Sequence, residues 1–463
     1  MKVTIGSQIK IEEPTALISK WCHDNLILTN PDYVKKQRMG FWTGNTPQKL
    51  FLYETNGDTL LIPFGCLRSI LGMITGATVS NTFVHPETVD YNAEVSLRSY
   101  QTEALDALVR HQYGILQAPA GSGKTQIGIA LACELGVKTL WLTHTKDLLN
   151  QSRDRAEQYI DKDLIGTITE GKVNVGAGIT FATIQTMCKV DLDKYRDVWD
   201  CIIVDECHRV AGSPTAVTQF SKVLNRLKAR HKYGLSATVH RADGLIKSTY
   251  SLLGEIVHTV PDEAVAEFIM KINVQPMATQ VQLTRECLNP DGTINYTSMI
   301  TFLTKHYGRN AQITQDLVDN RSHYNLILSE RVGHLKQLYL NLPPYLQEQA
   351  VMVDGTMTSK KQKEERNAAF EQMREGKKHY LFATYALAKE GLDIPRLDRL
   401  YLTTPQKDYA VITQSVGRVG RVFPGKEPPI VYDYVDANRA AVKSFKKRCT
   451  SYRKCNCTIL EDK

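Results

Sequence analysis

Residues 113–135 read YGILQAPAGSGKTQIGIALACEL, a short apolar run followed by a glycine-rich turn and then a helix-like segment. The turn, from Gln117 to Thr125, has the composition of a phosphate-binding loop placed between a strand and a helix. Glycines let backbone N–H groups approach phosphates, and the N-terminus of a helix adds positive potential. The pattern predicts a nucleoside triphosphate site inside an α/β domain.

Each residue type in this loop has an expected role. We expect backbone contacts to phosphate from four consecutive residues, Ala120, Gly121, Ser122 and Gly123. Lys124 can reach the β and γ phosphates, and the Thr125 hydroxyl can hold Mg²⁺. The eight-residue pattern begins with Ala118 where its strict form has glycine, which is a mild departure.

A second apolar run, Cys201 to Val204, ends in the sequence DECH at 205–208. Ligands of a parallel sheet lie outside the carboxyl ends of its strands, so these carboxylates are expected beside the phosphate loop. Asp205 can bind Mg²⁺ through water, and Glu206 can orient or deprotonate the attacking water. An Asp-Glu pair after a strand is also typical of a helix cap. Because a phosphate loop is also present, the Asp205-Glu206 pair favours catalysis of ATP hydrolysis.

The chain divides into three regions that differ in their pattern of apolar and polar residues. Residues 1–92 carry short β-type runs, such as 49–53 and 59–63, and predict a small strand-rich accessory domain that recognises substrate. Residues 93–262 alternate buried apolar runs with amphipathic segments, as a parallel sheet covered on both faces requires. The alternation returns from about 323, so 263–463 is expected to hold a connecting region over 263–322, a second α/β domain and a basic C-terminal helix.

Composition limits the class of protein. The 463 residues contain 42% hydrophobic and 23% charged side chains, which is typical of a globular chain. No run approaches the length of a membrane span, and the N-terminus does not resemble a signal peptide, so a cytoplasmic protein without membrane contact is expected. The net charge of +8 permits a polyanionic partner without demanding one. Nothing indicates an oligomer, so a monomer is expected.

The cysteine cluster near the C-terminus leaves two alternatives open. Cys449, Cys455 and Cys457 are three possible ligands at awkward spacing without a nearby histidine, so zinc is a minor alternative to free thiols.

The C-terminal tail is expected to be an amphipathic helix. It has a helical apolar stripe, Val442, Phe445, Cys449 and Tyr452. Its basic residues are Arg439, Lys443, Lys446, Lys447, Arg448, Arg453 and Lys454. They predict either phosphate contacts or a solvated face.

Four motifs in order resemble those of superfamily 2 helicases over roughly 97–435. They are the phosphate loop, the DECH sequence, Ser236-Ala237-Thr238 and the sequence QSVGRVGR at 414–421. LRSYQ at 97–101 and SATVHRAD at 236–243 are similar to the XPB, RecG and UvsW-like group, which includes phage DNA helicases. The resemblance implies two tandem RecA-like parallel-sheet domains after the strand-rich N-terminal domain, with ATP and Mg²⁺ as cofactors.

The resemblance also implies roles for residues around the nucleotide. Arg98 and Gln101 would lie at the adenine, and Gln414 would belong to the same site. Ser236, Ala237 and Thr238 would couple the nucleotide state to movement of the two domains. Arg418 and Arg421 would reach the γ phosphate, where a planar guanidinium suits the charge on the transferring phosphoryl oxygens. Each position has an ordinary alternative, such as a surface glutamine, a strand-end turn or a solvated helix face.

Nucleic-acid contacts are implied for five residues, Thr145, Gln151, Thr183, Gln185 and Thr384. Gly391 and Asp393, in the stretch FATYALAKEGLDIP, are expected beside the nucleotide and the bound strand. Hydroxyls, amides and backbone N–H groups suit phosphate oxygens and read no bases, although any of these residues could also be a cap or turn residue. The family often has proline where His144 and Val239 stand, so the loops that grip the strand are expected to differ.

Together these features predict an ATP-dependent DNA helicase or translocase that remodels or unwinds forked or branched DNA in replication, recombination or repair. If a phage encodes it, it would work in the host cytoplasm. Three alternatives stay open: an RNA helicase, a motor subunit of a restriction-type complex, and a DNA-binding protein that does not hydrolyse ATP. Lys124, Asp205, Glu206 and Arg421, all present, argue against the last.

Overall fold

The computed structural model describes residues 1–84, 86–238, 244–357, 359–389, 392, 394–406 and 408–461. The chain forms two compact units, Met1–Pro261 (unit 1) and Asp262–Lys463 (unit 2). No helix in the described part of the chain is long and apolar enough to cross a membrane.

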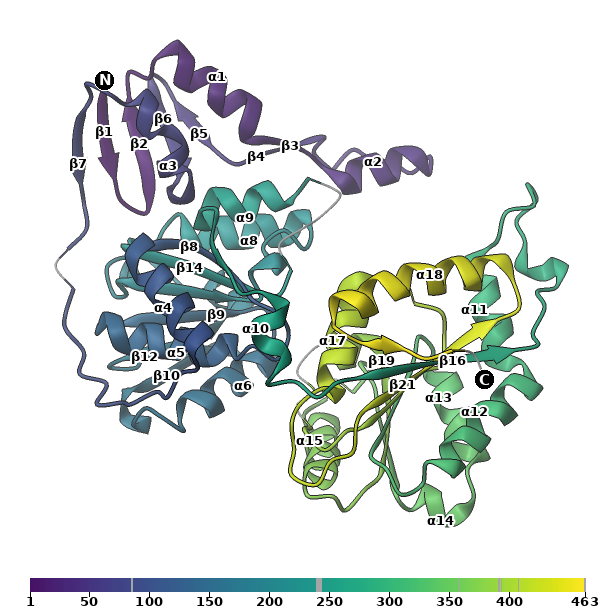
Figure 1. Ribbon diagram of the computed structural model, residues 1–463. Helices are drawn as coiled ribbons and strands as arrows, with labels where there is room; N and C mark the ends of the chain where they lie inside the picture. The colour runs from purple at the N-terminus through teal and green to yellow at the C-terminus, as the bar shows by residue number, and fades with distance from the viewer. Residues whose placement is uncertain are drawn as a thin grey trace. The chain divides into compact units, whose positions relative to one another are not determined.

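A five-stranded, mostly antiparallel sheet begins unit 1, so the strand-rich prediction for the N-terminal segment is confirmed (Figure 1). In sheet order its strands are β5 (Glu54–Asn56), β6 (Thr59–Pro63), β2 (Gln8–Glu12), β1 (Lys2–Ile5) and β7 (Thr78–Asn81). The other N-terminal elements are α1 (Ala16–Asn25), β3 (Ile27–Thr29), α2 (Pro31–Arg38), β4 (Lys49–Phe51) and α3 (Leu67–Ile70). Strands β3 and β4 pair with each other as a separate antiparallel ribbon.

The described remainder of unit 1 is built on an eight-stranded sheet, in which only β11 pairs antiparallel. Its order is β11 (Lys172–Asn174), β10 (Ile165–Thr169), β12 (Ile179–Thr183), β9 (Thr139–Thr143), β13 (Cys201–Asp205), β14 (His231–Ser236), β8 (Tyr113–Gln117) and β15 (Ile256–Thr259). The helices are α4 (Ser99–His111), α5 (Lys124–Leu135), α6 (Lys146–Ala156), α7 (Ile184–Met187), α8 (Pro214–Leu224) and α9 (Ile246–Leu253). Every residue of β9, β12 and β13 is buried, as expected for a sheet covered on both faces.

The two sheets of unit 1 share a hydrophobic core. Ile9 and Ile62 of the N-terminal sheet belong to the same buried cluster as Val217 of α8. Lys232 of β14 is fully buried, and its ammonium donates hydrogen bonds to the carbonyl oxygens of Ser7 and Leu224 at 3.0 and 2.9 Å. Apolar packing and buried hydrogen bonds therefore fix the N-terminal sheet to the α/β part of the same unit.

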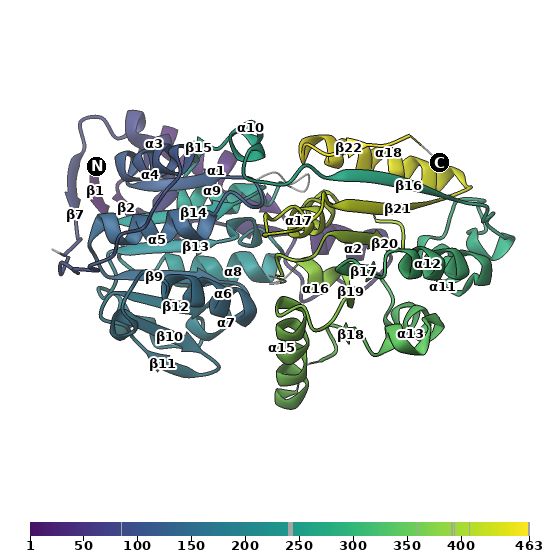
Figure 2. The same ribbon diagram turned by 60° about the horizontal axis from the view of Figure 1, so that its bottom comes forward.

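Unit 2 contains a seven-stranded sheet in its described residues, and all its pairs are parallel (Figure 2). The order is β18 (Ala350–Val353), β19 (Tyr380–Thr384), β17 (Asn325–Ser329), β20 (Arg399–Leu402), β21 (Ile430–Asp436), β16 (Asn273–Thr279) and β22 (Thr458–Ile459). The helices are α10 (Asp262–Ala266), α11 (Tyr296–Lys305), α12 (Tyr307–Asp319), α13 (Val332–Asn341), α14 (Pro344–Gln347), α15 (Lys360–Arg374), α16 (Tyr385–Lys389), α17 (Tyr409–Val419) and α18 (Arg439–Lys454).

The expectation that 263–322 is only a connecting region is wrong. This stretch supplies β16, which pairs along its whole length with β21, and both α11 and α12. Strand β16 lies apart in sequence from the other strands of the sheet. The alternation of apolar runs and helical segments that marks an α/β domain is therefore not visible in this stretch. A turn lies at Asn289–Gly292, where Gly292 has φ 76° and its N–H donates to the Asn289 carbonyl oxygen at 2.9 Å.

Candidate nucleotide-binding and catalytic site

The predicted catalytic residues of unit 1 lie at one edge of its large sheet. Strands β13, β14 and β8 are neighbours and parallel, so their carboxyl ends lie side by side. Asp205 pairs in register with Leu235, and the next residue, Ser236, pairs with Gln117. The phosphate loop connects β8 to α5, which begins at Lys124. This is the edge at which parallel α/β sheets bind ligands.

The phosphate loop has the backbone shape that its glycines predict. Gly121 and Gly123 have φ values of 85° and 77°, in the left-handed region that residues with a side chain avoid. A Cβ atom on Gly123 would also lie 2.4 Å from Nε2 of Gln101. Any larger residue at 123 would therefore strain the loop and displace Gln101.

Gln101 is bonded to this loop. The side chain is 2% exposed; its Nε2 donates to the Ser122 carbonyl oxygen at 2.8 Å, and its Oε1 accepts from the Arg98 backbone N–H at 2.9 Å. The Tyr100 hydroxyl donates to the same Ser122 carbonyl at 3.1 Å. Tyr100 was not predicted, since an aromatic residue at the start of an amphipathic helix is typical of a core position. An adenine contact from Arg98 and Gln101 stays a prediction.

The loop residues fit a bound triphosphate. The Ser122 hydroxyl is buried and has no hydrogen-bond partner among the described residues. Among the residues that the structure describes, the Lys124 ammonium makes two long hydrogen bonds, to the carbonyl oxygens of Ala118 and Pro119 at 3.3 and 3.4 Å. A hydroxyl and an ammonium with unused donors, in a glycine turn at a helix N-terminus, are the groups that phosphate oxygens need.

Asp205 is buried at the end of β13. Its Oδ1 accepts from the Glu206 backbone N–H at 2.9 Å, and its Oδ2 accepts from the Ser152 hydroxyl of α6 at 3.3 Å. Burial and the adjacent Glu206 carboxylate raise the pKa of Asp205 to about 6. Ser152 was missed because a serine in a polar helix has no distinguishing pattern. The Asp205 carboxylate and the Thr125 hydroxyl are hard oxygen ligands of the kind that Mg²⁺ takes.

A chain of side chains leads from Glu206 to the end of β14. Glu206 has φ 48°, and its Oε2 lies 3.2 Å from Nδ1 of His208. The same Nδ1 lies 3.0 Å from the Ser236 hydroxyl, which donates to the Thr238 carbonyl oxygen at 2.8 Å. Ala237 lies between them, half-buried. The DECH and Ser-Ala-Thr motifs are thus connected by direct contacts.

Four predicted nucleic-acid contacts lie at the carboxyl ends of the adjacent strands β9 and β12. Thr145 caps α6, because its hydroxyl accepts from the Leu148 backbone N–H at 3.3 Å, and Gln151 lies on the same helix. Thr183 ends β12, and Gln185 donates to the His144 carbonyl oxygen at 2.8 Å. The hydrogen bond from Gln185 joins the two loops. Their contact with nucleic acid stays a prediction.

The predicted residues of unit 2 lie on β19 and α17. Thr384 is the last residue of β19, and Gln414 and Arg418 lie half-buried on α17, with Arg421 just beyond it. Gly391 and Asp393 fall outside the described residues, as do 239–243 in unit 1. The roles of these residues at the nucleotide stay predictions.

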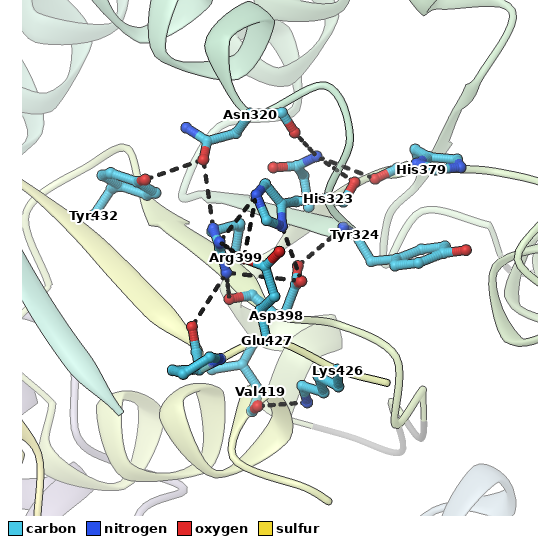
Figure 3. Close-up of polar contacts among 12 residues, drawn as sticks. Asn320, His323, Tyr324, His379, Asp398, Arg399, Val419, Lys426, Glu427 and Tyr432 are labelled. Carbon is cyan, nitrogen blue, oxygen red and sulfur yellow. Dashed lines mark hydrogen bonds and ion pairs between the residues drawn. The ribbon is translucent and has the colours of Figure 1, made fainter. Parts of the chain in front are cut away.

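Lys426 holds the end of α17 and was not predicted. Its ammonium donates to the carbonyl oxygens of Pro395, Val419 and Arg421 at 2.9, 2.7 and 2.8 Å. Burial lowers the pKa of Lys426 to about 7. Figure 3 shows Lys426 beside Val419, next to the polar cluster around Arg399. The lysine fixes the backbone from which the Arg421 side chain extends, although its loop sequence, PGKEPP, is typical of an exposed turn.

The basic tail is a helix, as predicted, but Arg448 is not on a solvated face. Arg448 is 2% exposed, and its guanidinium donates two hydrogen bonds of 2.7 Å to the Asp433 carboxylate. Tyr452 is fully buried and donates to the same carboxylate, whereas Val442 is 40% exposed and does not belong to the packed stripe. The prediction that Arg448 contacts phosphate is therefore wrong, because this side chain anchors α18 to Asp433.

Cys449, Cys455 and Cys457 are free cysteines, each partly buried. Burial raises the pKa of Cys455 to about 11 and raises the pKa of Cys457 further, so both are protonated thiols at neutral pH. Among the described residues, no group of three or more His, Cys, Asp or Glu side chains could hold a metal ion.

Two family models match successive parts of the chain. Residues 94–241 match the type III restriction enzyme res subunit, and residues 310–423 match the helicase conserved C-terminal domain. The first match includes the phosphate loop, the DECH sequence and Ser-Ala-Thr. The second includes β17 to α17.

Individual proteins of known name are similar to the chain as well. The chain is 28% identical over 412 residues to a protein of Acanthamoeba polyphaga mimivirus provisionally named ATP-dependent RNA helicase L396, a match that covers 87% of this chain and 75% of that protein. It is 29% identical over 194 residues to the DNA 3'-5' translocase XPB2 of Sulfurisphaera tokodaii, 42% of each. A fragment structure of a provisionally assigned type I restriction enzyme HsdR subunit from Vibrio vulnificus YJ016 shares its fold, with a TM-score of 0.59 and 16% identity over 97% of this chain and 83% of that one.

Two successive family matches, relatives that include XPB, and two parallel-sheet domains of RecA type agree with the ordered motifs. The chain is therefore a superfamily 2 helicase that hydrolyses ATP and resembles the XPB group.

Proposed function

We propose that the chain is a DNA motor that uses ATP hydrolysis to translocate on and remodel forked or branched DNA, in replication, recombination or repair. The observation that carries the motor is the contact chain from Glu206 through His208 to Ser236, directly beside the phosphate loop. DNA as the substrate is supported by the similarity to the archaeal XPB2 translocase.

In this proposal unit 1 binds and hydrolyses ATP. Backbone N–H groups of the loop from Ala120 to Gly123 and the Lys124 ammonium would hold the phosphates, while Thr125 and Asp205 would hold Mg²⁺. The ion would neutralise charge on the phosphate oxygens. Glu206 orients the attacking water and accepts its proton.

For Arg418 and Arg421 of unit 2, the family resemblance implies a contact with the γ phosphate. Arg418 and Arg421 stabilise the charge that develops on the transferring phosphoryl group, and Lys426 keeps the end of α17 in place for them. Hydrolysis removes this attraction, so the nucleotide state biases the arrangement of the two units. Ser236, Ala237 and Thr238 transmit that state from Glu206.

The bound strand contacts the loops at the carboxyl ends of the sheets. Thr145, Gln151, Thr183 and Gln185 in unit 1, with Thr384 in unit 2, contact phosphate oxygens and read no bases. Such contacts tolerate any sequence, as a motor that advances along a strand requires.

One relative favours a second substrate, and a family match and a solved structure favour a second context. The mimivirus protein is named for RNA, and the res-subunit and HsdR matches come from restriction enzymes. An RNA helicase would use the same ATP site. A restriction motor would need nuclease partners for DNA cleavage.

Strand displacement tests the proposal. The substrates are a forked DNA, a forked RNA and a blunt DNA duplex, each with ATP, using the parent protein and Glu206→Gln. We expect ATP-dependent separation of the forked DNA by the parent alone. Separation of RNA and not of DNA would assign the motor to RNA. Equal separation by Glu206→Gln would contradict the catalytic assignment.

A further inference from the structure

A separate feature of unit 1 is the segment of residues 30–51, here called the arm. It contains α2, the loop that follows it, and β4, and the β3–β4 ribbon connects it to the N-terminal sheet. Figure 1 shows α2 at the far end of this ribbon, away from the five-stranded sheet. The motor motifs lie elsewhere in the chain and do not explain this segment.

The tip of the arm exposes large apolar side chains. Met39 is 54% exposed, Phe41 59% and Trp42 74%. By contrast, Trp141 and Trp199 are buried. Neighbouring exposed side chains of this size indicate a contact surface.

The exposed rings are held in place by an ordered arm. Asn30 is 2% exposed; its side-chain Nδ2 donates to the Pro47 carbonyl oxygen at 2.8 Å and its Oδ1 caps α2. The Lys36 ammonium donates to the Thr46 hydroxyl at 2.7 Å. A Cβ on Gly44 would lie 2.2 Å from the Trp42 ring, so the indole lies directly on the Gly44 backbone. Because the rings are already positioned, a ligand binds them with a small loss of conformational entropy.

Charge around the rings identifies the class of ligand. The arm contains four basic residues, Lys35, Lys36, Arg38 and Lys49, and a single acidic residue, Asp32. Lys35, Arg38 and Lys49 are exposed. Aromatic faces between cations match the stacked bases and phosphates of a single strand. An apolar partner protein would not require this excess of positive charge.

The basic character continues from the arm into a groove. Phe51 of β4, 63% exposed, lines a cavity of about 710 Å³ between the N-terminal sheet and α8. Arg196, Lys222 and Arg226 line the same cavity, with Glu54 as its acidic residue. A strand that stacks on the tip therefore has a cationic path available for its backbone.

We propose that the arm is a binding site for single-stranded nucleic acid, in which Phe41 and Trp42 stack on unpaired bases while Lys35 and Arg38 contact phosphates. This site rests on the proposed nucleic-acid motor and specifies how the N-terminal part of unit 1 engages the unpaired region of a fork. It is distinct from the phosphate-reading loops at the carboxyl ends of the sheets.

Affinity measurements on the full chain without ATP test the site. The ligands are labelled single-stranded DNA, single-stranded RNA and a blunt DNA duplex, and the variant is Phe41→Ala with Trp42→Ala. Tyr307→Ala, which removes an aromatic side chain that is 84% exposed in unit 2, is the matched control. We expect the double variant to bind single strands at least about fivefold more weakly for each ring removed. Duplex affinity and ATP hydrolysis without polymer should match the control.

Tryptophan fluorescence gives a second readout. Stacking on Trp42 should quench emission of the parent on addition of unlabelled oligonucleotide, while Trp42→Phe should lose this quenching but keep most of the affinity. The site is overturned if the double variant binds single strands like Tyr307→Ala, or if it loses affinity for duplex equally. Preference for DNA over RNA or the reverse identifies the natural strand. Failure of the motor proposal would appear separately, as absence of polymer-stimulated ATP hydrolysis in the parent.

Discussion

The imidazole of His208 lies 3.0 Å from the hydroxyl of Ser236, which joins the DECH motif after β13 to the Ser-Ala-Thr motif after β14. Ser236 is fully buried. Its hydroxyl donates to the carbonyl oxygen of Thr238 and accepts from the backbone N–H of Thr238. A change at Glu206, which contacts His208, can therefore reach Ser236 and Thr238 through direct side-chain contacts.

Ser236→Ala tests this connection. The change removes the hydroxyl that bonds His208 and Thr238, while leaving the phosphate loop intact. The hydrogen bond to His208, which carries the connection, is worth about 1 kcal/mol, so we expect the number of ATP molecules hydrolysed per base pair separated to rise about fivefold. Parallel ATPase and unwinding assays measure this ratio. Ser248→Ala, at a buried serine of α9 outside the site, is the control; an equal ratio in both variants would show that Ser236 does not couple.

Arg448→Met should destabilise the protein. The substitution leaves the Asp433 carboxylate, 1% exposed, without its bidentate partner. Breaking a buried pair from one side costs about 3 to 5 kcal/mol of the free energy of unfolding, which urea denaturation measures. Arg453→Met removes an exposed arginine from the same helix and should change little. Equal stability of the two variants would contradict an anchoring role for Arg448.

The exposed basic residues of α18, which include Lys443, Lys446 and Lys447, are the part of the tail that can still contact phosphate. Changing Lys443, Lys446 and Lys447 to glutamine should reduce the slope of log affinity against log salt for single-stranded DNA by about 2. Binding titrations at several salt concentrations measure this slope. An unchanged slope would leave these lysines as solvated residues.

Stability should depend on pH through Lys232. Burial lowers the pKa of Lys232 from 10.5 to about 7. Between these values the unfolded chain binds more protons than the folded one, so the free energy of unfolding rises with pH by up to about 1.4 kcal/mol per unit. Below pH 7 the cost of burying the charge is fully present. The neutral amine still has two N–H donors for Ser7 and Leu224.

Urea denaturation of the parent and of Lys232→Met from pH 6.5 to 10 measures this contribution as the difference between the two curves. The variant should lose the rise, while Lys20→Met, at an exposed lysine, should retain it. Identical slopes of the free energy of unfolding against pH in the parent and in Lys232→Met would contradict the lowered pKa of Lys232.

Sequence patterns predicted the parts of the fold that are locally periodic. Runs such as CIIVD and NLILS are fully buried strands, and the phosphate loop has the predicted backbone. Strand β16 was missed because its seven residues, NVQPMAT, contain a proline and polar side chains. It pairs only through tertiary structure, with a strand about 150 residues later.

The site shows the same division. Lys124, Asp205 and Ser236 were predicted because motif spacing and strand ends determine them. Ser152 and Lys426 were not, because each acts through a partner that the local sequence pattern does not indicate: the Asp205 carboxylate for Ser152, and the Pro395 and Val419 carbonyls for Lys426. Arg448 was misassigned for a related reason, since a basic helix in the sequence does not show which arginine has a buried carboxylate beside it.

The rate of ATP hydrolysis with different polymers shows whether the chain is an ATP-driven DNA motor. The rate is measured with no polymer, single-stranded DNA, forked DNA and single-stranded RNA, for the parent, Lys124→Ala and the control Lys162→Ala, at an exposed lysine. Thermal unfolding confirms that the variants are folded. We predict greatest stimulation by forked or single-stranded DNA, and a loss of about 100-fold in Lys124→Ala alone. Hydrolysis by Lys124→Ala at the parent rate, or stimulation by RNA and not by DNA, would contradict the account of an ATP-driven DNA motor.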